Sequence, residues 1–158
     1  MTKKADINKE IKKAVQQLVL AKNKLKSLGV LRSERLVGEF GEWFAEQLIS
    51  GKRAISTTQS GWDIICNEKK YQVKTHAKSE SNGARWTEWK YTKKEFDFLI
   101  LLIFSSRLFL NEAYIIPYEI AERRVNRTRK QIVLDWDDYM DFKILEFPEN
   151  LKLFLANK

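Results

Sequence analysis

One apolar run, Phe96–Phe104 (FDFLILLIF), constrains the fold of this chain more than any other stretch. It is rich in Ile, Leu and Phe, and Ser105 and Ser106 end it. A run of this length and composition predicts a central β-strand buried on both faces, rather than a helix. Such a strand needs packed layers on both sides of its sheet, which is typical of α/β proteins.

The segments that follow predict further strands and helices. We expect a strand over Leu108–Ile116 and a helix that starts at Pro117, because proline is favoured in the first helical turn. The tail predicts a short strand, Gln131–Leu134, and an amphipathic segment, Leu145–Leu155. The acidic patch between them lacks the glycine and the terminal glutamate of an EF-hand loop, and we interpret it as solvated surface: Asp135, Asp137, Asp138 and Asp141.

The stretch Gly61–His76 predicts a β-hairpin, because GWDIIC and YQVKTH are rich in β-branched and aromatic residues and the NEKK between them is polar. Asp63 lies at the start of the first strand. Side chains alternate along a strand, so one face of the second strand carries Gln72, Lys74 and His76, and the other carries Tyr71, Val73 and Thr75. A polar trio on an otherwise apolar hairpin is either a solvated face or a functional site.

A helix and a strand are expected before this hairpin. Ser33 is a suitable N-cap for a helix over Glu34–Ile49, in which Glu39 and Glu42 are three residues apart and project near each other. A strand over Arg53–Thr58 and a turn at Gln59–Gly61 lead into the hairpin. The expected order is therefore a helix with a glutamate, a strand, a strand with Asp63, and a strand with Gln72 and Lys74.

Asp63 followed by Gln72-Val73-Lys74 resembles the signature of the PD-(D/E)XK nuclease superfamily, in its Q-x-K variant. Two positions depart from the family pattern: Trp62 stands where the family has proline, and Gln72 stands where it usually has an acid. The resemblance spans Glu34–Pro117 and implies a restriction-endonuclease-like αβββαβ core, with a mixed central sheet flanked by helices. It also implies the kind of protein found in bacteria, archaea and their mobile elements.

The resemblance implies a divalent-metal-dependent endonuclease that hydrolyses phosphodiester bonds of DNA, with Mg²⁺ as the cofactor and Mn²⁺ as a substitute. The implied catalytic residues are Glu42, Asp63, Gln72 and Lys74. The implied metal ligands are Glu42, Asp63, Gln72 and the carbonyl of Val73. Glu39 is an alternative to Glu42, and His76 an alternative contact to substrate. Both glutamates could instead be surface residues, and His76 a partly exposed strand residue.

Charge and composition bound the partners. The chain has 158 residues, 44% of them hydrophobic, which predicts a single domain: residues 1–30 as a helical extension, 34–117 as the core and 118–158 as C-terminal elements. The net charge of +8 favours a polyanion, with double-stranded DNA first and an anionic membrane surface second. No apolar run is long enough to span a bilayer and no signal peptide is recognisable, so we expect a cytoplasmic protein. One cysteine and one histidine cannot complete a zinc site.

The N-terminal segment Ile7–Leu28 predicts an amphipathic helix, with Gly29 as its C-cap. Its apolar residues alternate at spacings of four and three, which is a heptad seam: Ile7, Ile11, Ala14, Leu18, Ala21, Leu25 and Leu28. The seam either docks on the protein's own core or pairs with another molecule, as in a homodimer.

A polar stretch, residues 77–94, predicts a loop that ends in exposed aromatic and basic residues. Cations can contact phosphates and rings can stack on bases, so we expect this patch and the basic end of the Pro117 helix to bind nucleic acid. The candidates are Arg85, Trp86, Trp89, Lys90, Lys93, Lys94, Arg123, Arg124 and Arg127. Alternatively, Trp86 and Trp89 anchor a short helix to the core. Two other functions stay open, a non-catalytic nucleic-acid-binding protein on the same fold and a basic oligomeric interaction protein.

Overall fold

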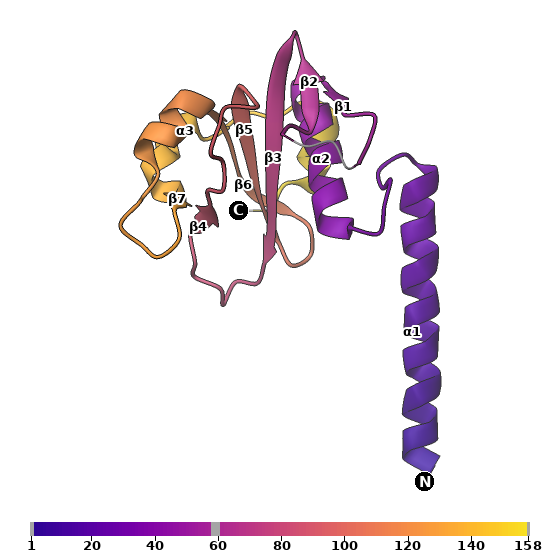
Figure 1. Ribbon diagram of the computed structural model, residues 1–158. Helices are drawn as coiled ribbons and strands as arrows, with labels where there is room; N and C mark the ends of the chain where they lie inside the picture. Colours follow the sequence, from indigo (N-terminus) through magenta and orange to yellow (C-terminus); the bar gives the residue numbers. More distant parts are fainter. Residues whose placement is uncertain (1, 58–60, 158) are drawn as a thin grey trace.

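A mixed sheet stands at the centre of the molecule in the computed structural model, which describes residues 2–57 and 61–157 (Figure 1). The sheet is five-stranded, in the order β1-β2-β3-β5-β6. Its strands are β1 (Lys52–Arg53), β2 (Ile64–Cys66), β3 (Lys69–Lys78), β5 (Phe98–Ser105) and β6 (Leu110–Pro117). β1, β2 and β3 form an antiparallel meander, β5 runs parallel to β3, and β6 is antiparallel to β5. The expected α/β class with a mixed central sheet is confirmed.

β5 is the buried strand that the apolar run predicts. Its side chains alternate between two hydrophobic cores, one on each face of the sheet. Ile100, Leu102 and Phe104 face one core, and Leu99, Leu101 and Ile103 face the other; all are at most 1% exposed. The continuous apolar sequence follows from this double burial, because neither face of the strand meets water.

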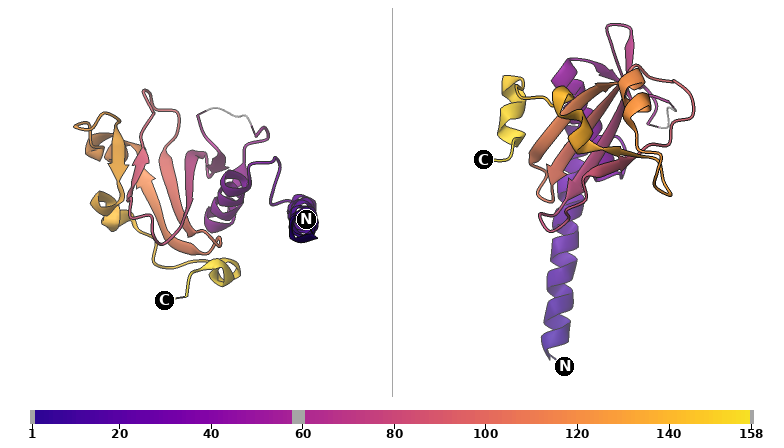
Figure 2. Two further views of the ribbon diagram at one scale, coloured as in Figure 1. Left: turned by 90° about the horizontal axis from the view of Figure 1, so that it is seen from below. Right: turned by 90° about the vertical axis from the view of Figure 1, so that its left-hand side faces the viewer.

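Helix α2 (Leu36–Ile49) covers one face of the sheet, where Phe40, Phe44 and Ala45 pack into the first core (Figure 2). The 3₁₀ helix η2 (Glu149–Phe154) completes that layer through Leu151. The opposite face is covered by shorter elements: α3 (Tyr118–Arg124), the 3₁₀ helix η1 (Trp136–Phe142), and the two-stranded sheet of β4 (Trp86–Glu88) and β7 (Val133–Asp135).

Two predicted boundaries around the hairpin are wrong. In the described residues, the strand expected over Arg53–Thr58 is limited to β1 and Ala54, whose N–H donates to the carbonyl of Asp63 at 2.7 Å. The side chain of Ile55 is fully exposed, so it adds no packing that would hold the chain extended there. The turn between β2 and β3 is Asn67-Glu68, shorter than NEKK, because both residues have positive φ (48° and 65°) and close a two-residue hairpin. Residues 58–60 lie outside the described part of the chain.

The link from β3 to β5, residues 79–97, contains β4 and loops but no helix, although the αβββαβ pattern expects one there. Trp89, Tyr91 and Phe96 of this link pack against one another, with ring centroids 4.8 to 6.2 Å apart. These irregularly spaced aromatic side chains fix the crossover in the second core, so the segment covers the sheet without helical periodicity.

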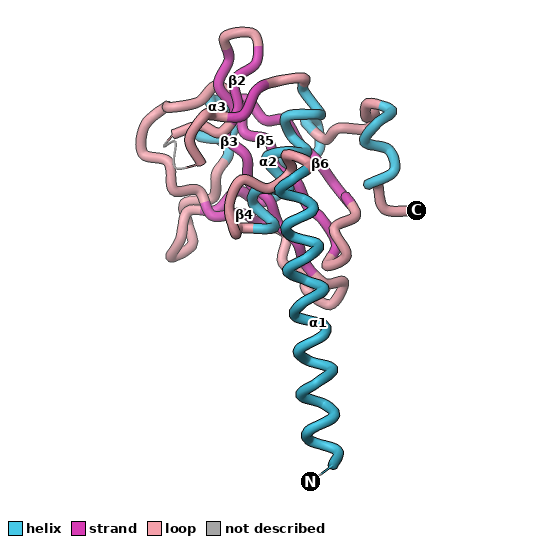
Figure 3. The backbone as a smooth tube through the Cα atoms, turned by 90° about the vertical axis from the view of Figure 1, so that its right-hand side faces the viewer, coloured by secondary structure: helices cyan, strands magenta, loops and turns pink. Residues whose placement is uncertain are grey.

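Helix α1 (Thr2–Ser27) stands out from the rest of the molecule, and its N-terminal end lies far from the sheet (Figures 1 and 3). Most of the seam is exposed, with Ile7, Ile11 and Leu18 between 54% and 58% accessible. Of the two alternatives for the seam, docking on the protein's own core is therefore wrong except at Leu25, which packs beside Val30 and Leu31. No helix in the described residues is long and apolar enough to cross a membrane.

Candidate active site

Asp63 lies at an open edge of the central sheet. β2 pairs with β3 only as far as Tyr71, whose carbonyl accepts from the N–H of Asp63 at 2.8 Å, and beyond it no strand of the described residues pairs with this edge. At this unpaired part of β3, the carboxylate of Asp63 accepts a backbone hydrogen bond that a neighbouring strand would otherwise accept. It accepts from the N–H of Val73 at 2.7 Å and from Nε2 of Gln72 at 2.5 Å. The hairpin thus orients the carboxylate through both backbone and side chain.

Glu42 reaches this edge because α2 approaches β3 very closely. A Cβ added at Gly41 would stand 1.8 Å from Oγ1 of Thr75, so the backbone of the helix lies directly against the Thr75 side chain of the strand. Glu42, the next residue, is 9% exposed. Burial raises the pKa of Glu42 to about 7, and the negative charges of Asp63 and Glu39 add to this effect. The Glu42 and Asp63 carboxyl groups are therefore near neighbours.

Lys74 and Tyr91 complete the surroundings of Asp63. Burial raises the pKa of Asp63, while the N–H of Val73 and the ammonium of Lys74 act in the opposite direction. Nζ of Lys74 lies 5.7 Å from the ring centroid of Tyr91. The hydroxyl of Tyr91 is buried with no hydrogen-bond partner, and burial followed by the charge of Asp63 raises its pKa. Acidic and basic groups thus converge from α2, β3 and the crossover.

Two arginines that the sequence did not single out belong to this cluster. The backbone N–H of Arg32 donates to Glu39 at 2.7 Å, and its guanidinium lies 3.4 Å from Glu42. Arg35 lies 3.8 Å from Glu39 and 3.9 Å from Glu42. Glu39 is fully buried, so the interpretation of both glutamates as surface residues is wrong. The signal that could have revealed this arrangement is a pair of cations placed just before two glutamates at helical spacing.

Gln72 and His76 behave differently from the expected ligand and substrate contacts. Gln72 donates from its amide nitrogen to Asp63, so its side chain orients the Asp63 carboxylate. The expected role of its carbonyl oxygen as a metal ligand is not what this hydrogen bond shows. His76 shares a hydrogen bond with Thr87 at 2.8 Å, and its ring centroid is 5.3 Å from that of Trp136. Burial lowers the pKa of His76. The histidine therefore belongs to the packing between β3 and β4.

The oxygen ligands at the open edge are of the type that a hard divalent cation prefers. Asp63 and Glu42 are oxygen donors whose charges repel each other, and a cation between them would relieve that repulsion. In an extended strand the N–H and C=O of one residue point to the same side, so the carbonyl of Val73 faces this edge as well. In the described residues, no group of three or more His, Cys, Asp or Glu side chains is arranged to hold a metal ion. Two carboxylates and one carbonyl are the protein ligands on offer.

No protein-family model matches this sequence, and no curated protein is significantly similar to it.

Several predicted nucleic-acid contacts have structural partners. Trp89 is 4% exposed and donates from Nε1 to Glu122 at 2.8 Å, so it anchors the crossover in the core, although on a strand end and not on a helix. Arg85 holds Glu112 at 2.8 Å and Asp137 at 2.9 Å, which lowers the pKa of Glu112 to about 2. Trp86 is 37% exposed.

The remaining basic candidates lie at the surface. Most form exposed ion pairs within the molecule: Lys90 with Glu88, Lys93 with Glu95, Lys94 with Glu119, Arg124 with Asp141, and Arg127 with Glu122. Arg123 is exposed. Exposed single pairs of this kind are worth little, so the three lysines and Arg127 can exchange their partners for phosphates. Arg124 is held more firmly, because it binds both carboxylate oxygens of Asp141 and lies over the rings of Tyr139 and Phe142. Glu95 lies against Gly61, so the loop that carries Lys93 and Lys94 passes beside the chain two residues before Asp63.

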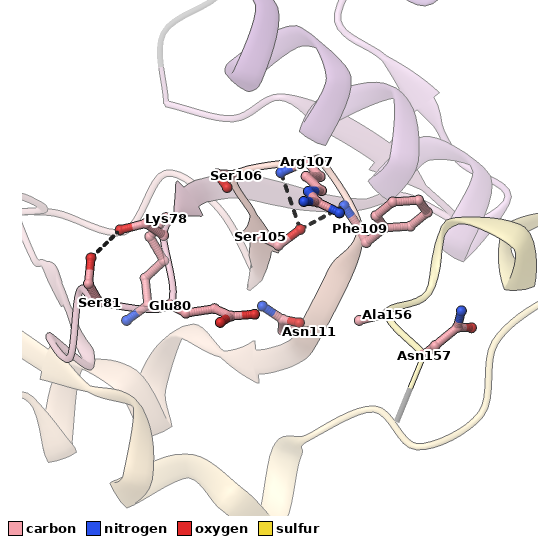
Figure 4. Close-up of a pocket in the computed structure, with 11 residues that line it drawn as sticks. Lys78, Glu80, Ser81, Ser105, Ser106, Arg107, Phe109, Asn111, Ala156 and Asn157 are labelled. Carbon is pink, nitrogen blue, oxygen red and sulfur yellow. Dashed lines mark hydrogen bonds between the residues drawn. The ribbon is translucent and has the colours of Figure 1, made fainter.

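A hollow of about 800 Å³ lies elsewhere, at the ends of β3 and β5 (Figure 4). It is lined by Lys78, Arg107 and several serines, and it shares no lining residue with the Asp63 cluster. Its hydroxyl groups hold the surrounding loops: Oγ of Ser105 accepts from the N–H of Arg107 and of Phe109, both at 3.3 Å. The hollow is therefore distinct from the candidate active site.

Proposed function

We propose that this protein is a divalent-metal-dependent endonuclease that hydrolyses phosphodiester bonds of DNA, of the restriction or mobile-element type. The observation that carries the proposal is that Glu42 and Asp63, two carboxyl groups from separate elements, lie close enough for the charge of Asp63 to raise the pKa of Glu42, and that the charge of Lys74 acts on Asp63. The order of α2, β1, β2 and β3 supports a restriction-endonuclease-like core of the PD-(D/E)XK kind. The crossover without a helix would be a variation of that core.

Each side chain has a role in this proposal. Asp63 and Glu42 would hold Mg²⁺ or Mn²⁺ together with the carbonyl of Val73, and Gln72 keeps the Asp63 carboxylate in position. Such an ion would lower the pKa of a water and neutralise charge on the phosphate. The ammonium of Lys74 holds the attacking water or stabilises the charge that develops on the phosphorane. Arg35, which is 64% exposed beside the carboxylates, is placed to contact an adjacent phosphate.

Double-stranded DNA is the proposed substrate because the chain carries a net charge of +8 and its loop with Lys93 and Lys94 passes beside Gly61, two residues before Asp63. Phosphate contacts by these lysines would make binding depend strongly on salt, with a log-log slope of several units. DNA retention that does not change between low and high salt would argue against this surface.

A non-catalytic DNA-binding protein on the same fold is the second candidate. Gln72 favours it, since it supplies a hydrogen-bond donor where an acid would strengthen a cation site, and only two carboxylates remain. The two candidates separate in one experiment, in which supercoiled plasmid is incubated with the protein and Mg²⁺, Mn²⁺ or EDTA. Nicked or linear products with either metal, and none with EDTA, are expected from a nuclease. DNA binding without any cleavage would leave the second candidate.

A further inference from the structure

The seam of α1 is an apolar surface that the described part of the protein leaves exposed. Ile7, Ile11, Val15 and Leu18 are each more than half exposed on one side of the helix. Apolar side chains gathered in this way on a soluble domain mark a contact surface. Their spacing of three and four is that of a coiled coil, in which the partner is another helix.

The sizes of the seam residues select an orientation for a partner of identical sequence. Consider two antiparallel copies of α1 aligned so that Gln16 of one copy is at the same height as Gln16 of the other. Each alanine of the seam then faces a large residue. The opposed layers are then Ile7 with Leu25, Ile11 with Ala21, and Ala14 with Leu18, each occurring twice. A parallel, in-register pair would instead oppose alanine to alanine at residues 14 and 21. Large against small fills space, whereas small against small leaves voids.

The charges select the same orientation. In an antiparallel coil the two residues that flank the seam on the same side come together, which brings Glu10 beside Lys24 of the other helix, twice per pair. The opposite flank brings Val15 beside Val15 of the second copy. In a parallel pair Glu10 would flank Val15 and find no cation. Glu10 pairs with the exposed Lys13 of its own helix at 2.9 Å, and Lys24 is exposed, so Glu10 and Lys24 are both accessible to a second copy.

We propose that α1 pairs with α1 of a second copy as an antiparallel two-helix coiled coil whose two-fold axis passes near Gln16. The paired region, from residue 7 to residue 25, is about 28 Å long at 1.5 Å per residue. The two folded domains then lie at opposite ends of the coil, because each follows the C-terminal end of its own α1 (Figure 1). Leu25, half-buried against its own core, meets Ile7 of the partner with its remaining surface. The pairing does not depend on nuclease activity.

The oligomeric state of the full chain tests the pairing. Sedimentation equilibrium is expected to show a concentration-dependent dimer of twice 18.7 kDa. Leu18→Glu puts a charge into both central layers and should weaken the dimer at least tenfold. Leu20→Glu is the matched control, since Leu20 is 68% exposed on the opposite side of the helix, and this variant should dimerise like the wild type. A monomeric wild type, or equal effects of the two substitutions, would overturn the proposal.

A charge exchange tests the antiparallel register. Glu10→Lys and Lys24→Glu each create two like-charge contacts per dimer and should each weaken it by about tenfold or less. The double variant restores both pairs, and its dissociation constant should return close to that of the wild type. Effects on the helix alone would accumulate in the double variant instead of cancelling. A double variant that is as weak as the single ones, or weaker, would overturn the antiparallel arrangement.

Discussion

Gly41 lies against Thr75 so closely that a Cβ on residue 41 would stand 1.8 Å from the threonine Oγ1 and 2.7 Å from its Cβ. This contact sets the distance between α2 and β3, and with it the position of Glu42 beside Asp63. We predict that Gly41→Ala destabilises the fold by about 2 to 4 kcal/mol, because a helix or a strand must move away from a buried contact. Urea unfolding measures the change.

Gly38→Ala is the matched control for this substitution. Gly38 lies in the same helix, but a Cβ there has no neighbour within 4 Å. Alanine is the better helix former by up to about 1 kcal/mol, so this variant should be as stable as the wild type or more stable. If both alanines changed stability alike, the close approach of α2 to β3 would not be what limits residue 41.

A second prediction concerns Asp63, whose carboxylate accepts from Val73 and Gln72 and points to the open edge. Asp63→Asn keeps the shape of the side chain but removes the charge that holds a cation. DNA cleavage should fall by at least about 100-fold, while DNA binding changes little. Initial rates on plasmid with saturating Mg²⁺ measure this effect.

Asp97→Asn makes the same chemical change at a comparable place. Asp97 also accepts from a backbone N–H of β3, that of Lys70 at 2.9 Å, but it lies outside the Glu42–Asp63 cluster. The cleavage rate of the Asp97→Asn variant should stay within about threefold of the wild-type rate. This change is smaller than the rate loss caused by removing one electrostatic catalytic contact. Wild-type rates in Asp63→Asn would remove Asp63 from the reaction.

Local sequence patterns were sufficient for part of this architecture. The Phe96–Phe104 run revealed β5 because double burial leaves a continuous apolar signature, and the spacing of Asp63, Gln72 and Lys74 follows from a hairpin that is local in sequence. The exposure of α1 was not predictable, because the same heptad spacing suits an internal or an external partner. The burial of Glu39 depends on its contact with Arg32 in the turn before α2. Such a contact cannot be predicted from the spacing of apolar residues.

The third prediction is a dependence of stability on pH that arises from Glu42. Its pKa is about 7 in the folded protein against 4.5 ordinarily, so the folded state binds more protons than the unfolded state between these values. Without metal, the contribution of Glu42 is therefore fully present below pH 4.5 and is lost as the pH rises through 7. In Glu42→Gln the side chain stays neutral, so above pH 7 this variant should be the more stable protein by up to about 3 kcal/mol.

The difference between the two proteins is the quantity to measure, at several pH values with EDTA present. The lowered pKa of His76 makes stability change with pH in the opposite sense, but His76 is common to both proteins and its effect cancels. Adding Mg²⁺ should stabilise the wild type more than Glu42→Gln, since a bound cation favours the ionised carboxyl. If the stability of the two proteins changed with pH in the same way, Glu42 would not have the raised pKa that its burial beside Asp63 implies.

The last prediction uses Gln72, which now donates its amide proton to Asp63 at 2.5 Å. Gln72→Glu removes that donor and places a third carboxylate at the open edge, so at pH 8 without metal the fold should lose about 1 to 3 kcal/mol. The added charge strengthens a cation site, so Mg²⁺ should raise the melting temperature of this variant more than that of the wild type. Gln72→Ala lacks both donor and charge and should show the smallest shift, together with weaker cleavage that excess Mn²⁺ partly restores.

Gln131→Glu, which adds a charge at an exposed position outside the cluster, controls for net charge and should respond like the wild type. Equal metal-induced shifts in all four proteins would mean that no cation binds beside Gln72, and the non-catalytic DNA-binding protein would then be the better description of this fold.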